Sequence, residues 1–92
     1  DIGLEQKSLF SEIKFENPVN KKFEVDILSN QNTKLILDIY SVTGRNIFNN
    51  KSKIYPGRNE LIYNLSELPF GIYFAVFTDS ENNRVVKKVV VN

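Results

Sequence analysis

Apolar and polar residues alternate with a period of two along most of this chain. Such alternation is the pattern of strands that bury one face and leave the other in water. Near the start, Leu9, Ile13 and Phe15 fall on one face. Asn17-Pro18 ends this run, because proline cannot donate a hydrogen bond to a strand ladder. We therefore predict a first strand over Leu9 to Phe15.

Three later runs alternate in the same way and predict three more strands with an apolar face. Their core-facing residues are Phe23, Val25 and Ile27, then Leu35, Leu37 and Ile39, and then Leu61, Tyr63 and Leu65. Turn-forming residues bound these runs at Ser29–Asn32, Thr43-Gly44 and Pro56-Gly57. In such turns glycine accepts a positive φ without a steric penalty.

The remaining segments depart from simple alternation. Arg45–Tyr55 is polar through its middle, which is typical of an edge strand. Ile72–Phe77 is apolar on both faces, which predicts a central strand covered on two sides. A polar hairpin loop, Asp79–Asn83, leads into a seventh strand over Val85–Val91. Ser66–Pro69 is predicted as one short turn of helix.

Seven short strands, turn signals about every 8–12 residues and no sustained helical periodicity indicate an all-β, immunoglobulin-like antiparallel sandwich. A chain of 92 residues suits one domain with a thin, two-layer core. Residues 1–8 lack the pattern and are predicted to be a linker, with the domain over residues 9–92. The chain begins at Asp1 rather than Met, so we expect it to be a piece of a longer protein.

Composition argues against several classes of function. Twelve basic and eleven acidic residues give a net charge of +1, unlike the basic excess of a nucleic-acid binder. No stretch approaches the roughly 20 apolar residues that span a bilayer, so we expect no membrane insertion. The chain has neither Cys nor His, and therefore lacks the thiol nucleophile and the usual general base. Glu24 and Asp26 are a carboxylate pair on the polar face of a strand, and we expect no enzyme and no cofactor.

Two other patterns, a loop rich in oxygen ligands and two glycosylation sequons, each allow a functional interpretation and a simpler structural one. Asp79–Asn83 concentrates oxygen ligands that calcium favours, but it lacks the glycine and the spaced acids of an EF-hand loop. A solvated hairpin loop is therefore favoured, and no metal site is predicted. Asn50-Lys51-Ser52 and Asn64-Leu65-Ser66 match the glycosylation sequon, which matters only in a glycosylating pathway.

Three tyrosines, Tyr40, Tyr55 and Tyr63, are candidates for a sugar-binding face, because aromatic rings stack on apolar faces of ligands. Tyr63 shares its face with Leu61 and Leu65, so core packing is the better interpretation there. For Tyr40 and Tyr55 we favour core or edge packing.

Two lysines, Lys87 and Lys88, interrupt the valine run of the last strand. Charges on an exposed strand deter edge-to-edge aggregation, and the residues alone favour this interpretation. The alternative is a docking strand that offers backbone groups to a receptor. Val85, Val89 and Val91 are predicted to hold one face on the core. The adjacent lysines then point to opposite faces unless a bulge intervenes.

Four stretches in order resemble the C-terminal sorting domain of the type IX (Por) secretion system, in its type A-like form. The likeness covers about residues 13–92 and rests on their order and spacing. The stretches are Glu16–Asn20, Leu37–Tyr40 with Thr43-Gly44-Arg45, Leu65–Phe74 and Arg84–Val91.

This resemblance implies a non-catalytic export signal, a monomer fused behind an N-terminal cargo domain. An outer-membrane translocon would recognise it after passage through the periplasm. At the cell surface a sortase-like cysteine peptidase would remove it, and the cargo would be anchored to anionic lipopolysaccharide or released. Because the family is recognised through its last strand, the resemblance favours the docking role for the lysines. The candidate recognition residues are Gly71, Tyr73, Lys87, Lys88, Val89, Val90 and Val91.

Two other functions stay open on the residues alone. One is an accessory β-sandwich module of an exported enzyme that binds glycan or spaces domains, motivated by Tyr40 and Tyr55. The other is a purely structural domain within a larger assembly.

Overall fold

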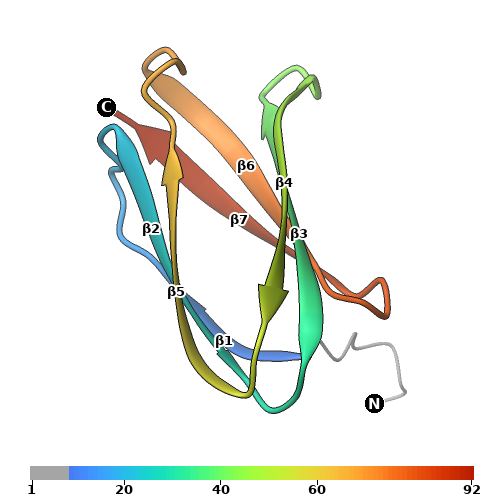
Figure 1. Ribbon diagram of the computed structural model, residues 1–92. Coiled ribbons are helices and arrows are strands. Elements are labelled where there is room, and N and C mark those ends of the chain that lie inside the picture. Colours follow the sequence, from blue (N-terminus) through green and yellow to red (C-terminus); the bar gives the residue numbers. More distant parts are fainter. Residues whose placement is uncertain (1–8) are drawn as a thin grey trace, which may run out of the picture.

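Residues 9–92 are described by a computed structural model, which shows seven strands and no helix over that range (Figure 1). The strands are β1 (Phe10–Lys14), β2 (Lys22–Ser29), β3 (Thr33–Ser41), β4 (Asn46–Ile54), β5 (Gly57–Asn64), β6 (Gly71–Thr78) and β7 (Arg84–Val91). Each lies at a run that the sequence predicted as a strand. The expected linker, residues 1–8, lies outside the described residues.

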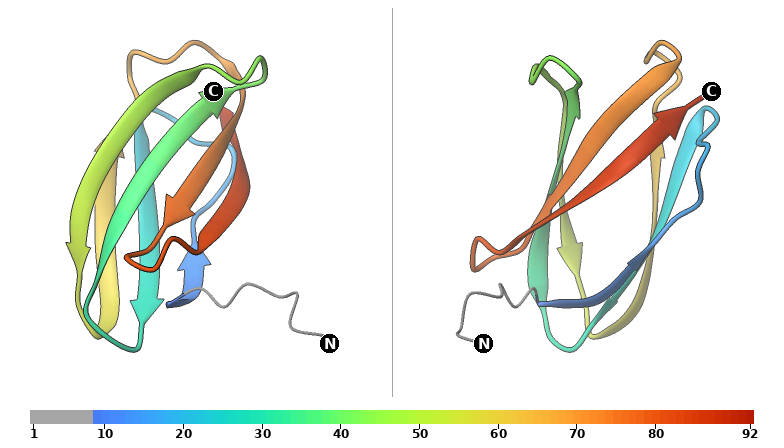
Figure 2. Two further views of the ribbon diagram at one scale, coloured as in Figure 1. Left: turned by 90° about the vertical axis from the view of Figure 1, so that its right-hand side faces the viewer. Right: turned by 180° about the vertical axis from the view of Figure 1, so that it is seen from behind.

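The strands form two antiparallel sheets that face each other (Figure 2). One sheet has the order β1-β2-β5 and the other the order β4-β3-β6-β7. The pairs β2–β5 and β3–β6 join strands that are not consecutive in the chain, so the sandwich is not a simple meander. This order is that of an immunoglobulin-like sandwich in which the fourth strand pairs with the third. The predicted fold class is confirmed.

The core lies between the sheets and is built from every second residue of the inner strands. Phe23, Val25 and Ile27 of β2 face Leu35, Leu37 and Ile39 of β3, and all six are at most 1% exposed. Tyr63 and Leu65 are also buried, while Leu61 is half-buried. The alternation in these three strands therefore assigned the inward face correctly. β4 lies at a sheet edge, as its polar middle predicted.

The predicted inward face of β1 is wrong at its start. Phe10 is buried and Leu9 only half-buried, although the period-two pattern placed Leu9 inward. The register with β2 shifts between Phe10 and Glu12, which is a β-bulge. One extra residue reverses the alternation, so Phe10 and Ile13 both face the core although they lie three positions apart.

The prediction that both faces of β6 are covered is also wrong. β6 is central in its sheet, between β3 and β7, but Ile72 is 45% and Phe74 37% exposed. A two-layer sandwich covers one face of each sheet, and no helix within residues 9–92 lies over the other. The helical turn expected at Ser66–Pro69 is instead a tight turn in which the Leu68 N–H donates to the Leu65 carbonyl at 3.0 Å.

Candidate functional site at the terminal hairpin

The last strand, β7, forms the edge of the four-stranded sheet and pairs with β6 along its whole length. No register shift interrupts this pairing, so Lys87 and Lys88 point to opposite faces, as predicted. Val89 and Val91 are buried and Val85 packs half-buried against the core, which confirms the predicted inward face. Lys87 falls in this inward row and is nevertheless exposed, because its long stem carries the ammonium group to water.

The structure brings the seven candidate recognition residues together on the β6–β7 hairpin, but they differ in access. Tyr73, Val89 and Val91 are buried, and their side chains hold the hairpin on the core. Lys87 and Lys88 are exposed, whereas Gly71 and Val90 are half-buried. A partner of the folded domain can therefore touch the two lysines and Val90 directly, but not the buried three.

Gly71 and Tyr73 shape the entry into this hairpin. Gly71 has a φ of +152°, a conformation that side-chain-bearing residues rarely adopt. The Tyr73 hydroxyl donates to the Pro69 carbonyl at 2.7 Å and so fastens the β5–β6 connection to β6. This arrangement matches the tyrosine corner of immunoglobulin-like folds, where a tyrosine near the start of the sixth strand bonds to backbone a few residues earlier.

The outer edge of β7 is half covered by the segment Asn17–Val19, which we call the clasp. The Asn17 amide donates to the Lys88 carbonyl at 3.0 Å and accepts from the Val90 N–H at 2.9 Å. The Val19 N–H donates to the Val90 carbonyl at 2.7 Å, and the Asn92 N–H donates to the Val19 carbonyl at 2.8 Å. The Asn17 side chain thus bonds to β7 as the backbone of an added strand would.

Sequence reasoning missed the clasp because its partners lie more than 70 residues apart. Asn17-Pro18 was predicted as the end of a strand and lies in the first of the four family stretches, but no local pattern points to β7. The hydrogen bonds at Val90 show that the even-numbered residues of β7 point their backbone N–H and C=O groups away from β6. By this alternation Val86 also faces outward, and within residues 9–92 its outer backbone groups have no hydrogen-bond partner. β7 therefore has one covered half and one open half.

The outer face of the hairpin is apolar around a single lysine. We call it the outer β6–β7 face. It consists of Ile72, Phe74 and Val76 of β6, which lie opposite Val90, Lys88 and Val86 of β7. Val86 is 60% exposed, and the face is open to solvent. Contiguous apolar residues on a solvated sheet commonly mark an interaction surface.

The Asp79–Asn83 loop is a hairpin, as predicted, but its aspartate is buried and not solvated. One Asp79 carboxylate oxygen accepts from the backbone N–H groups of Glu81 and Asn83 at 2.8 and 3.0 Å. The other accepts from the Leu9 N–H at 2.8 Å and the Asn83 amide at 3.0 Å. Burial alone would raise the Asp79 pKa, but the bonds from Leu9, Asn83 and Glu81 outweigh it and lower the pKa.

These N–H donors occupy the oxygens that a calcium ion would need. Within residues 9–92, no group of three or more His, Cys, Asp or Glu side chains is placed to hold a metal ion. The other carboxylate pair, Glu24 and Asp26, lies on the outer face of β2, the wet side that the sequence predicted. Both sequon asparagines are exposed, and each accepts from a serine of its own triplet, Asn50 from Ser52 and Asn64 from Ser66.

The three tyrosines form no common platform. Tyr63 packs in the core, as predicted, in edge contact with Phe48 at 5.8 Å between ring centroids. Tyr40 is half-buried near the end of β3, and the exposed Tyr55 follows β4 beside the start of β3. Strand rise separates these positions by roughly 20 Å, which is too far for both rings to stack on one small sugar. No helix long and apolar enough to cross a membrane occurs in the described part of the chain.

Comparison with known proteins identifies the family of this chain. A family model described as "Secretion system C-terminal sorting domain" matches residues 15–92. The matched range contains the clasp and six of the seven strands, β2 to β7. A search of the curated proteins found no match. Members of this family are generally non-catalytic.

The family implies interaction with the secretion machinery, attachment to an N-terminal cargo, and export to the cell surface or the extracellular space. The resemblance inferred from the four sequence stretches is thereby confirmed, and nothing favours the accessory-module alternative. Because the match covers nearly the whole chain, this protein belongs to the secretion system C-terminal sorting domain family and acts as a sorting signal for type IX secretion.

Proposed function

We propose that the outer-membrane translocon of the type IX system recognises this sorting domain at the β6–β7 hairpin. Lys87, Lys88 and Val90 make the direct contacts. Gly71, Tyr73, Val89 and Val91 hold the hairpin in the shape that is recognised. The observation that carries the proposal is the edge position of β7, with Lys88 at the centre of the outer β6–β7 face.

Two physical features support this role. An edge strand offers backbone groups for strand addition, and the half of β7 around Val86 keeps them open. The outer β6–β7 face adds exposed apolar area, and desolvation of apolar area on binding is favourable by roughly 25 cal/mol per Å². Lys88 lies within that face and selects for a partner that presents a carboxylate there.

The remaining steps of the pathway belong to the same proposal. The cargo and this domain pass through the periplasm before the translocon engages the hairpin. A sortase-like cysteine peptidase at the cell surface then removes the domain, which itself carries no catalytic activity, cofactor or metal. The domain is a monomer that binds neither nucleic acid nor membrane.

Export of a reporter tests the proposal. The chain is fused behind a reporter with a signal peptide and expressed in a host that has the type IX pathway. The unaltered fusion is expected outside the cell. Its retention in the periplasm would contradict the export role itself.

The recognition surface is tested with Lys88→Glu in the same fusion. Lys88 is exposed, so the domain stays folded while the charge of the outer β6–β7 face is reversed. We expect the fusion to accumulate in the periplasm. Lys51→Glu is the matched control, because it makes the same charge change at an exposed position of the edge strand β4. Equal secretion of both variants would exclude Lys88 from recognition.

A further inference from the structure

Part of β2 has no neighbour along one side. β1 pairs with β2 only from Asp26 to Ser29, and the chain then leaves β2 for the clasp on β7. The Lys21 carbonyl accepts from the Leu65 N–H on the β5 side. The backbone N–H and C=O groups of successive residues point to alternate sides of a strand. Those of Lys22 and Glu24 therefore point away from β5, to the open side. Within residues 9–92, these outward backbone groups of Glu24 have no hydrogen-bond partner.

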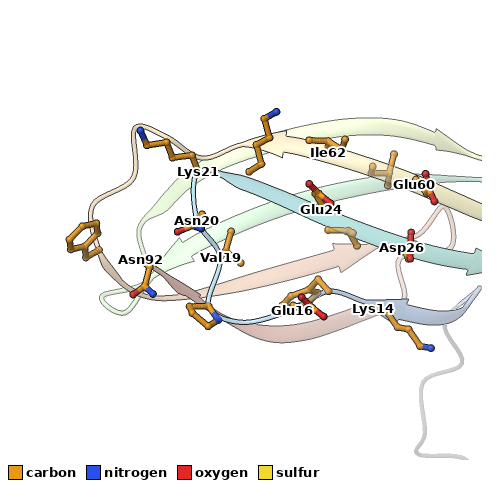
Figure 3. Close-up of a pocket in the computed structure, with 16 residues that line it drawn as sticks. Lys14, Glu16, Val19, Asn20, Lys21, Glu24, Asp26, Glu60, Ile62 and Asn92 are labelled. Carbon is orange, nitrogen blue, oxygen red and sulfur yellow. The ribbon is translucent and has the colours of Figure 1, made fainter.

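This open edge borders a groove of about 1290 Å³ that separates β2 from the segment leading to the clasp (Figure 3). Phe15 and Val19 line the groove on one side, and Val25 and Leu61 line it toward the core. Phe15 holds its place by an edge contact with Phe23, at 4.9 Å between ring centroids. The groove is therefore apolar at depth and bounded by unpaired backbone, which is a geometry that accepts an extended chain.

The rim of the groove has separated charges. Four carboxylates line it, from Glu16, Glu24, Asp26 and Glu60. Figure 3 shows Glu24 and Asp26 along β2, with Glu16 across the groove from them.

The lysines of the rim leave its central stretch acidic. Lys14 is ion-paired with Glu12 at 3.4 Å, on exposed side chains. Lys21 lies toward the end of the groove at which Asn92 lies, as Figure 3 shows, and Lys22 shares the outer face of β2 with Glu24, two residues before it. A ligand that passes between Glu24 and Glu16 therefore meets carboxylates on both sides of the groove.

We propose that this groove binds an extended segment of a partner protein by strand addition to β2. The backbone of the segment pairs with Lys22 and Glu24. Side chains alternate along a strand, so one set faces Phe15 and Val19 and must be apolar. The other set lies on the outer face, and its member beside Glu24 must be basic, because opposite charges attract across neighbouring strands. The surface is distinct from the β6–β7 hairpin, and its role does not depend on recognition there.

The test uses the 92-residue chain and an acetylated, amidated peptide, Val-Lys-Val-Lys-Val, in an NMR titration. We expect saturable binding, and slower hydrogen exchange at the Glu24 amide. A peptide with Glu in place of Lys should not bind. A peptide N-methylated at the amides that face β2 should also fail, because it keeps the charges and loses the ladder bonds.

Variants of the chain locate the site. Glu24→Lys should weaken binding of the lysine peptide about tenfold or more, which corresponds to 1.4 kcal/mol or more. Glu81→Lys is the matched control, since it makes the same charge change at an exposed loop position on β6–β7 and should leave binding unchanged.

Several results would overturn the proposal. They are absence of binding, equal binding of the N-methylated or the glutamate peptide, and shift changes that map outside the groove. Protection of Glu24 that rises with protein concentration in the absence of peptide would instead assign this edge to a second copy of the chain.

Discussion

At the scale of single residues, two buried tyrosines differ in whether the hydroxyl group has a hydrogen-bond partner. Tyr73 donates its hydroxyl to the Pro69 carbonyl, whereas the Tyr63 hydroxyl is buried without a hydrogen-bond partner in the described structure. Burial raises the pKa of the Tyr63 phenol, and the nearby Ser52 hydroxyl opposes this rise only in part. The alternation with Leu61 and Leu65 assigned Tyr63 to the core, but it could not show whether the Tyr63 hydroxyl has a hydrogen-bond partner there.

This difference gives a matched pair of predictions for Tyr→Phe substitutions. Tyr73→Phe should lower the free energy of unfolding by about 1 kcal/mol, because a hydrogen bond is lost and a carbonyl is left unpaired. Tyr63→Phe should leave it unchanged or raise it by up to about 1 kcal/mol, because an unpaired polar group is removed from the core. Urea denaturation measures both. Equal losses in the two variants would show that the Tyr63 hydroxyl has a partner.

At the scale of elements, the clasp reduces the part of the β7 edge that is open to a partner strand. The period-two pattern predicted a strand with Val89 and Val91 inward, and the family resemblance favoured a terminal strand that docks to a partner. The structure keeps the edge position but shields the half near Val90 through the Asn17 amide. Strand addition along the whole of β7 therefore requires the clasp to dissociate from β7 first.

Asn17→Ala tests this shielding. The substitution removes the side-chain amide that accepts from the Val90 N–H. Hydrogen exchange at the Val90 amide should therefore speed up about tenfold or more. The Val89 amide should not change, because β7 keeps its pairing with β6. Asn20→Ala, at an exposed position just after the clasp, is the control. Unaltered protection of Val90 in Asn17→Ala would show that the side-chain amide does not hold the edge.

At the scale of the whole molecule, the Asp79 carboxylate connects the two sheets. It lies at the end of the β6–β7 hairpin and accepts from the Leu9 N–H at the entrance to β1. Thr33, at the start of β3, holds the same loop within the four-stranded sheet through hydrogen bonds with Ser80 at 3.0 and 3.1 Å. One buried group thereby couples the first strand to the last hairpin.

This coupling predicts an acid-sensitive stability. The folded-state pKa of Asp79 is lowered, so protons bind more tightly to the unfolded chain than to the folded one. The stabilisation is complete above the ordinary carboxyl pKa of about 4 and is lost as the pH falls through the lower folded value. Asp79→Ala should cost about 2–3 kcal/mol at neutral pH, because buried N–H groups lose a charged acceptor.

Urea denaturation between neutral pH and pH 2 measures this dependence. The stability of Asp79→Ala should fall less steeply in acid than that of the unaltered chain, so the two curves converge. A constant difference at all pH values would show that the carboxylate is not the group that titrates.

The sequence by itself determined which residues form strands and, for most of them, which face turns inward. Phe23, Leu37 and Tyr63 were assigned correctly because burial of alternate apolar side chains depends on a local period of two. The order of four short stretches also sufficed to indicate the sorting family. The location of the candidate site on β6 and β7 came from that resemblance.

The tertiary structure alone decided what depends on distant neighbours. The bulge at Phe10 arises from the register with β2, and the open outer face of β6 arises because only two layers stack. The clasp at Asn17 and the unpaired edge at Glu24 depend on where the chain crosses from one sheet to the other. A local pattern describes which side of a strand is apolar, whereas the neighbours along its edges are set by contacts between residues far apart in the chain.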